Sequence, residues 1–185
     1  KSYVRTRLSI TSFLSNEMHA GKPSVKLIYC RVQNQQDEQV TMQHITFRKI
    51  TEDNWIQASN IKHSKAQSAF VADGLEILAL AYVNRDKNAQ CQAIYADDEM
   101  VGLMLVEELV EEPSCYHLHE FLIDQKHQHQ GYGSIAIGML LNSLSIERKF
   151  PRVEACVHMK NEKAIAFYEK AEPSRKKRLL SHSSY

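Results

Sequence analysis

The sequence predicts an α/β domain built on a mixed β-sheet. Strand-like and helix-like apolar patterns follow one another in the order β-α-α-β-β-β-α-β-α, and a glycine-containing loop joins the fourth strand to the longest helix. The chain has 185 residues, of which 43% are hydrophobic and 24% charged, enough for one domain with a sizeable core.

The first strand is expected at His44–Ile50, where apolar and polar residues alternate. Two helices follow with apolar residues at helical spacing, one from Trp55 to Ile61 and one after Asp73-Gly74. The remaining elements are a hairpin made of QAIYA, the turn Asp97-Asp98 and MVGLMLVEEL, a strand at Tyr116–Ile123, a helix from Ser134 to about Lys149, a strand at Arg152–His158 and a helix at Asn161–Lys170.

No membrane segment, secretory signal, disulfide framework or metal site is indicated. No apolar run reaches the roughly 18 residues that a membrane span needs, and the start of the sequence lacks the apolar stretch of a secretory signal. The four cysteines lie far apart and form no CxxC pair. A cytoplasmic location is therefore expected.

Charge is unevenly distributed along the chain. Residues 42–170 hold 13 Lys/Arg and 18 Asp/Glu, whereas both ends are basic. An acidic domain attracts a cationic small substrate by electrostatic steering, although a slightly acidic domain needs no such role. The basic run Arg175–Arg178 is short and has no interleaved aromatic residues, so no nucleic-acid partner is expected.

The most informative segment is FLIDQKHQHQGYGS, residues 121–134, in which a strand runs through a loop into a helix. Gly131 and Gly133 permit positive φ and let the backbone approach a ligand closely. The N–H groups that open the helix would then form an anion site suited to a pyrophosphate. A glycine-rich turn without a ligand is the alternative. Neither GxxxxGK[ST] nor GxGxxG is present, which argues against a Walker-type loop and a dinucleotide fold.

Two motifs resemble those of the GNAT acetyltransferases. Gln128–Gly133 fits the family's Q/R-x-x-G-x-G/A pattern, and Asn161-x-x-Ala164-x-x-Phe167-Tyr168 follows about thirty residues later. The stretch FLID…Q.QGYG looks most similar to the branch of bacterial diamine, spermine and spermidine N-acetyltransferases. The resemblance covers residues 42–171.

This resemblance implies the GNAT fold, a mixed central sheet with helices on both faces, whose strands Tyr116–Ile123 and Arg152–His158 splay apart around acetyl-CoA. It implies that the strand backbone pairs with the pantetheine arm, that the glycine loop cradles the pyrophosphate and that the last helix contacts the arm. The cofactor-binding residues implied in this way are Phe121, Leu122, Ile123, Gln128, His129, Gln130, Gly131, Tyr132, Gly133, Ser134, Asn161, Ala164 and Phe167.

The catalytic groups implied are an acid and a base. Tyr168 matches the tyrosine that protonates the departing CoA thiolate in the family, with plain packing as the alternative. For the base, strand alternation places His117 and His119 on one face and Glu120 on the other. Glu120 is the first candidate and His119 the second. The carboxylates at the hairpin end are expected to be solvated, with attraction of a polyamine as the alternative: Glu107, Glu108, Glu111 and Glu112.

Two features depart from the family pattern. His129 stands where the branch usually has glycine. Its imidazole is expected in solvent unless the loop needs positive φ there, with contact to a phosphate as the alternative. Glu172 and Pro173 replace the expected glycine and phenylalanine, and the two strands that would complete the sheet are missing. An uncovered edge at Arg152–His158 is therefore expected.

Residues 1–41 form an N-terminal extension outside the resemblance, and residues 172–185 a basic tail. The only β-prone segment outside the domain is Val25–Val32, which we expect to pair with an exposed edge of this domain or of a second copy in a dimer. The alternative is that both ends are flexible and that the domain is only marginally stable.

The sequence thus predicts an enzyme that transfers an acetyl group from acetyl-CoA to a small primary amine, such as a polyamine, by direct attack in a ternary complex. The alternatives are a peptide, protein or aminoglycoside N-acetyltransferase, and a degenerate acyl-CoA-binding module without turnover. A homodimer is expected from the resemblance.

Overall fold

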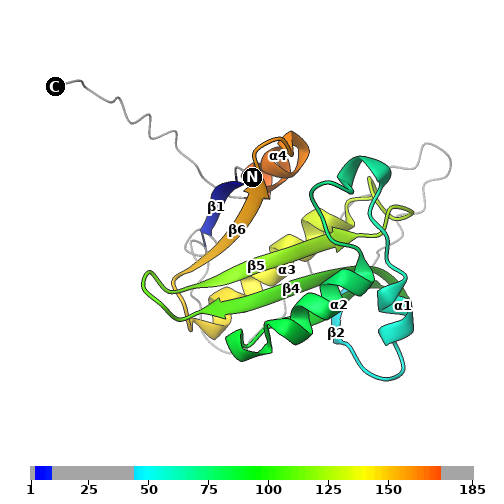
Figure 1. Cartoon of the computed structure of the whole chain (residues 1–185), viewed down its shortest axis with the longest axis horizontal. Helices are drawn as coiled ribbons and strands as arrows, with labels where there is room; N and C mark the ends of the chain where they lie inside the picture. Colours follow the sequence, from blue (N-terminus) through cyan, green and yellow to red (C-terminus); the bar gives the residue numbers. More distant parts are fainter. Residues whose placement is uncertain (1–2, 10–43, 172–185) are drawn as a thin grey trace, which may run out of the picture.

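The computed structural model describes residues 3–9 and 44–171, which form a six-stranded mixed sheet with helices on both faces (Figure 1). The strand order is β1-β6-β5-β4-β3-β2. The strands are β1 (Tyr3–Ser9), β2 (Ile45–Lys49), β3 (Gln90–Ala96), β4 (Glu99–Leu109), β5 (Cys115–Ile123) and β6 (Arg152–His158). The helices are α1 (Trp55–Ser59), α2 (Gly74–Val83), α3 (Tyr132–Glu147) and α4 (Glu162–Ala171), with 3₁₀ turns η2 (Lys65–Gln67) and η3 (Arg85–Lys87).

Every strand and helix predicted from His44 onward is present. Helix α2 begins after Asp73 because a capping box fixes its start: the Asp73 carboxylate accepts from the N–H of Glu76 at 3.2 Å, and the Glu76 carboxylate accepts from the N–H of Asp73 at 2.9 Å. Helix α3 starts at Tyr132, two residues earlier than expected, so that Gly133 lies inside its first turn. No helix of the described ranges is both long and apolar enough to cross a bilayer.

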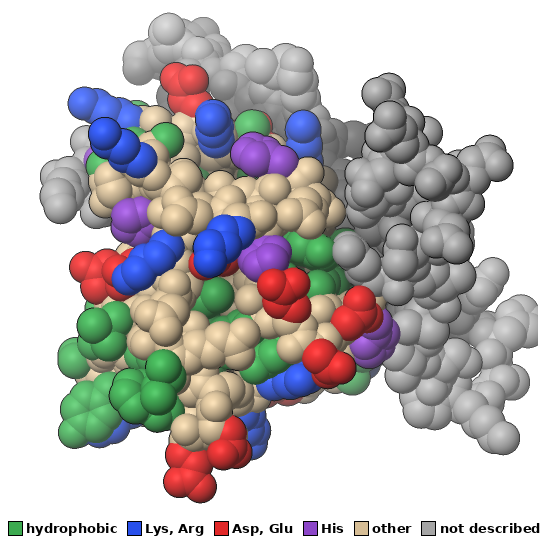
Figure 2. All heavy atoms as spheres, turned by 90° about the vertical axis from the view of Figure 1, so that its right-hand side faces the viewer, with side chains coloured by type: hydrophobic (Ala, Val, Ile, Leu, Met, Phe, Trp, Pro, Cys, Tyr) green, Lys and Arg blue, Asp and Glu red, His purple; other side chains and the backbone are tan. Residues whose placement is uncertain are grey.

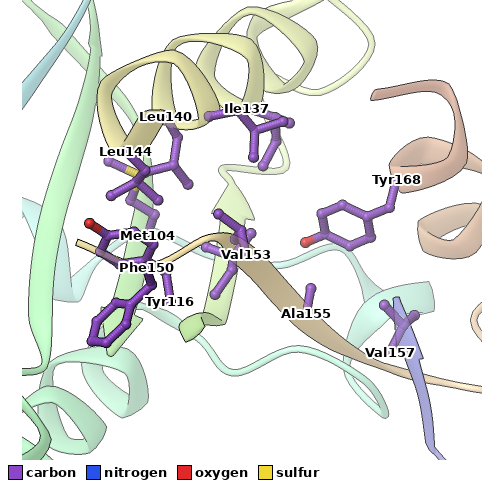
Figure 3. Packing of buried hydrophobic residues seen from close by; sticks show 12 residues of the cluster. Met104, Tyr116, Ile137, Leu140, Leu144, Phe150, Val153, Ala155, Val157 and Tyr168 are labelled. Carbon is purple, nitrogen blue, oxygen red and sulfur yellow. The ribbon is translucent and has the colours of Figure 1, made fainter. Parts of the chain in front are cut away.

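The core lies in two layers, one on each face of the sheet. Helices α1 and α2 cover one face, where Ala58, Ile61 and Ile77 pack on Leu103 and Leu105 of β4. Helices α3 and α4 cover the other. The buried residues of that second layer come from β4 to β6 and from both helices, and include Met104, Tyr116, Leu118, Ile137, Leu140, Leu141, Leu144, Val153, Ala155, Val157 and Tyr168 (Figure 3).

Strand β1 covers the outer edge of β6. The two strands pair antiparallel along their whole length, from Tyr3 opposite His158 to Ser9 opposite Arg152. The expectation of an uncovered edge at β6 is therefore wrong, since β1 satisfies the backbone groups that such an edge would leave unpaired. The strand comes from the N-terminal extension, as expected, but from a segment other than Val25–Val32. That segment and residues 172–185 lie outside the described residues.

Strands β5 and β6 pair in parallel over three positions only, Tyr116–Leu118 against Val153–Ala155. Beyond this point β5 continues to Ile123 and stays paired with β4, while β6 continues to His158 and stays paired with β1. Each strand therefore keeps one hydrogen-bonded neighbour while the two separate. The splay predicted between these strands is confirmed, and we call it the split.

Candidate active site

The loop before α3 has the backbone of an anion-binding turn. Gly131, the residue that precedes the helix, has φ of 86°, a left-handed value that favours glycine. Its carbonyl accepts from the N–H groups of Ser134 at 3.1 Å and Ile135 at 3.3 Å. The N–H groups that come before these are the ones that helix geometry leaves without intrahelical acceptors. Because no acidic residue lies in the first turn, this helix end is suited to a phosphate.

His129 also adopts a left-handed backbone conformation, with φ of 65°. The loop therefore does require positive φ at the position where the related branch usually has glycine. A non-glycine residue is strained in this region. The side chain of His129 lies on the exposed surface.

The glutamines of the loop hydrogen-bond to the protein itself. The side-chain amide of Gln128 donates to the carbonyl of Ile123 at 2.9 Å and to the side-chain oxygen of Gln67 at 2.8 Å. The amide of Gln130 donates to the carbonyl of Lys126 at 3.2 Å. In this structure both side chains stabilise the conformation of the loop. The groups that the loop offers to a ligand are therefore mainly its backbone N–H groups.

The ends of β5, α3 and α4 meet at the split. A Cβ atom placed on Gly133 would lie 3.5 Å from the ring of Phe167 and 3.6 Å from the side chain of Ile123. The rings of Phe121 and Phe167 stack with centroids 6.0 Å apart. The side-chain oxygen of Asn161 accepts from the N–H of Ala164 at 3.2 Å and so caps α4. The predicted cofactor-binding residues of three separate segments are therefore neighbours.

A β-bulge in β5 changes which side chains share a face. Leu105 pairs with Glu120, whereas the next residue, Val106, pairs with Leu118, so His119 is an extra residue in β5. Because paired residues lie on the same face, Glu120 lies with Leu105 on the face covered by α1 and α2. Leu118 lies on the opposite face, in the core against α3.

The prediction that Glu120 and the histidines lie on opposite faces is therefore wrong. His117 pairs with Glu107, which lies two residues along β4 from Leu105 and thus on the same face as Glu120. The physical reason is the bulge: one inserted residue shifts the alternation of every residue after it. Glu120, His117 and His119 can then all act on the same side of the sheet.

Glu120 and Tyr168 are electrostatically linked next to the split. Burial raises the pKa of the half-buried Glu120 carboxyl, with a smaller contribution from Glu76, while His119 and the N–H of Ala72 act in the opposite direction. Burial also raises the pKa of Tyr168, and the charge of Glu120 adds to this rise. The ring of Tyr168 extends from α4 toward β6 (Figure 3), and its exposed fraction is 8%. Tyr168 thus packs in the core and also lies within the field of Glu120.

Glu107 is buried, with 1% of its surface exposed, so the expectation of a solvated carboxylate at this position is wrong. Its two oxygens lie 2.7 Å from Nδ1 of His119 and 3.4 Å from Nδ1 of His117. The rings of the two histidines stack with centroids 5.3 Å apart. We call these three residues the Glu107 cluster.

The segment before α2 borders the site, which no pattern in the sequence predicted. The N–H of Ala72 hydrogen-bonds to Glu120, and the ring of Phe70 lies 5.3 Å from that of His158 at the end of β6. The segment and α2 line an open hollow of about 490 Å³. Its lining residues are Ser68, Ala69, Phe70, Val71, Ala72, Glu76, Ala79, Leu80 and Val83. Only the long-range fold brings this segment to the split.

The split sheet and the open helix end together define an acyl-CoA-binding transferase of the α/β class. The GNAT acetyltransferase family profile matches residues 47–172, and the chain therefore belongs to the GNAT family of acetyltransferases. It is accordingly an acetyl-CoA-dependent N-acetyltransferase, with acetyl-CoA as the co-substrate. The uncapped turn at Gly131 and the space at Gly133 fit this co-substrate, since neither places an acidic or bulky group in the cradle.

Solved structures of several N-acetyltransferases share the fold at low sequence identity. Spermidine N-acetyltransferase from Vibrio cholerae, in complex with CoA and spermine, is 16% identical with a TM-score of 0.54, over 69% of this chain and 79% of that one. An aminoglycoside acetyltransferase from an uncultured soil metagenomic sample is 18% identical (TM-score 0.51; 76% and 95% covered). Ribosomal-protein-alanine N-acetyltransferase from Brucella melitensis is 16% identical (TM-score 0.52; 77% and 97% covered). Among curated proteins no match is found.

Proposed function

We propose that the chain acetylates a small primary amine, with Glu120 as the base and Tyr168 as the acid. The observation that carries this proposal is the electrostatic link between a half-buried carboxylate on β5 and a buried phenol on α4, beside the split. It is supported by the meeting of Phe121, Gly133 and Phe167 at the same split, since the resemblance assigns these three residues to the cofactor.

The proposed reaction is a direct transfer in a ternary complex. The amine nitrogen attacks the thioester carbonyl, and the ammonium proton passes to Glu120, directly or through a water molecule. The C–S bond then breaks, and the phenol of Tyr168 donates its proton to the sulfur as the thiol leaves. His119 remains the second candidate for the base, since it lies on the same face next to Glu120.

A polyamine is the leading acceptor in this proposal, for two reasons. The central domain is acidic, which attracts a cationic acceptor, and Glu76 lies close enough to affect Glu120. On the face of the molecule seen in Figure 2, acidic, basic and histidine side chains are interspersed among the described residues. An aminoglycoside or a peptide N-terminus is the alternative acceptor, and we place the reaction in the cytoplasm, carried out by a homodimer.

The test is an acetyl-transfer assay that measures free thiol. The full chain is incubated with acetyl-CoA and, separately, with spermidine, spermine, a diamine, an aminoglycoside and a peptide with a free N-terminus. We expect amine-dependent thiol release that is largest with the polyamines, and a loss of roughly 10²-fold or more in Glu120→Gln. Thiol release only with the aminoglycoside or the peptide would show that this compound, and not a polyamine, represents the acceptor. Saturable CoA binding without thiol release would favour a binding module.

A further inference from the structure

We propose that the Glu107 cluster binds one divalent transition-metal ion through Glu107, His117 and His119. The three residues each offer one donor atom, and these atoms lie within 4.8 Å of one another. The donor set is one carboxylate and two imidazoles. Strand alternation already predicts that His117 and His119 share a face, and the pairing of β4 with β5 brings Glu107 of the neighbouring strand to them. This inference does not depend on the proposed acetyl transfer.

The separations in the cluster are close to those of metal ligands. Donor atoms about 2.0–2.2 Å from a tetrahedral zinc ion are about 3.3–3.6 Å from each other. The Glu107 oxygen and Nδ1 of His117 are 3.4 Å apart, within that range. The other Glu107 oxygen and Nδ1 of His119 are 2.7 Å apart, a hydrogen-bond distance. Binding an ion therefore requires an outward movement of His119, which lengthens its separation from the Glu107 oxygen.

The burial of the three side chains leaves the ion one open side. Glu107 has 1% of its side chain exposed, whereas His117 has 16% and His119 has 28%. The carboxylate thus forms the floor of the cluster, and the two rings form its solvent side. Solvent can supply the remaining ligands there, as it does in zinc sites with two histidines and one carboxylate.

The donor set selects among ions. Imidazole ligands suit Zn²⁺, Cu²⁺, Fe²⁺ and Ni²⁺, and two histidines with one carboxylate form a donor set known for both Zn²⁺ and Fe²⁺. Mg²⁺ prefers oxygen ligands and keeps several bound waters, so the cluster should not bind it. It therefore serves as a control ion of the same charge. Moving a cation to a partly buried position costs free energy because the ion loses water. The negative charge of the buried Glu107 carboxylate offsets part of this cost.

The cluster is also held in place without an ion. Glu107 and His117 are paired residues of adjacent strands, and the stacked rings fix the two imidazoles against each other. Rigid strand positions keep donors in place better than loop positions do. Little ordering is then needed when the ion binds, which favours affinity.

The experiment is calorimetric titration of the tag-free, EDTA-dialysed full chain with ZnCl₂, and with MgCl₂ for comparison. The variants are His117→Ala and His119→Ala. The matched control is His127→Ala: Nε2 of His127 lies 3.4 Å from a carboxylate oxygen of Glu99, but among the described residues this pair belongs to no group of three possible metal ligands. We expect one zinc ion per chain and no magnesium binding. Each cluster variant should weaken zinc binding by about tenfold or more, and His127→Ala should not.

Thermal unfolding gives a second readout. Zinc that binds only the folded chain raises the Tm, and this rise should be as large in His127→Ala as in wild type and smaller in both cluster variants. Zinc bound elsewhere on the chain adds equally to all four proteins. If zinc affinity and the zinc-dependent Tm rise are the same in His119→Ala as in wild type, or if wild type binds no zinc, the three residues are only a hydrogen-bonded triad and the proposal is overturned.

Discussion

Tyr168 is the residue in which packing and chemistry overlap most. Replacing it with phenylalanine removes only the hydroxyl and keeps the buried ring. We expect Tyr168→Phe to lower kcat by roughly 10²-fold or more and to leave the Kd for CoA within a few-fold, because only proton donation is lost. Steady-state kinetics and CoA calorimetry measure the two effects. A variant with wild-type kcat would return Tyr168 to a packing role.

The pH dependence of the same residue follows from the direction of its pKa. Burial and the charge of Glu120 raise the pKa of Tyr168 above the ordinary tyrosine value near 10. The phenol therefore keeps its proton at neutral and mildly alkaline pH. At any pH below about 10, ionisation of this group should leave the wild-type kcat unchanged. A fall in kcat at lower pH, present in wild type and absent in Tyr168→Phe, would contradict this assignment.

His129 tests backbone strain at one position of the loop. Its φ of 65° suits glycine, and the left-handed region costs other residues about 1–2 kcal/mol. Because glycine also gains entropy in the unfolded chain, we expect His129→Gly to raise the free energy of unfolding by a smaller net amount, up to about 1 kcal/mol. Urea denaturation measures it. The control is Gln125→Gly, an exposed residue of the same loop without positive φ, which should destabilise; equal losses in both variants would remove the strain argument.

At the scale of elements, the pairing of β1 with β6 is expected to stabilise the edge of the sheet. A proline removes one backbone N–H, which is tolerated in an edge strand only where that N–H points away from the sheet. In an antiparallel edge strand, the N–H groups of successive residues point alternately toward the partner strand and away from it. Of Arg5→Pro and Thr6→Pro, one should therefore lower the free energy of unfolding by about 1–3 kcal/mol more than the other. Two variants that both melt like wild type would show that β1 does not stabilise β6.

The bulge at His119 has its effect at the same scale. Local sequence predicted β5 correctly, and simple alternation then placed its side chains on the wrong faces after residue 119. A bulge depends on the partner strand, because it is defined by two residues facing one. The shared face of Glu120 and the Glu107 cluster therefore follows from how β4 and β5 pair.

At the scale of the whole molecule, we expect a CoA bound in the split to contact both β5 and β6 and the two helices α3 and α4. Gly133→Asp places a carboxylate beside Phe167 and Ile123 at the start of α3. We expect this variant to lose most of its CoA affinity and most of the Tm rise that CoA produces in wild type. The matched control is Gly138→Asp, the same change in the same helix where a Cβ meets nothing within 4 Å. Undiminished CoA affinity in Gly133→Asp would refute the placement of the pyrophosphate.

The sequence by itself determined the order of elements from His44 to Ala171, the glycine turn before α3 and the family to which the chain belongs. These are local properties: apolar period, capping residues and a glycine that must take positive φ at residue 131. Tertiary structure alone decided that Tyr3–Ser9 covers β6, that Phe70 and Ala72 reach the split and that Glu107, His117 and His119 meet. The physical reason is that strand partners, bulges and burial depend on contacts between segments far apart in the chain, which no local pattern encodes.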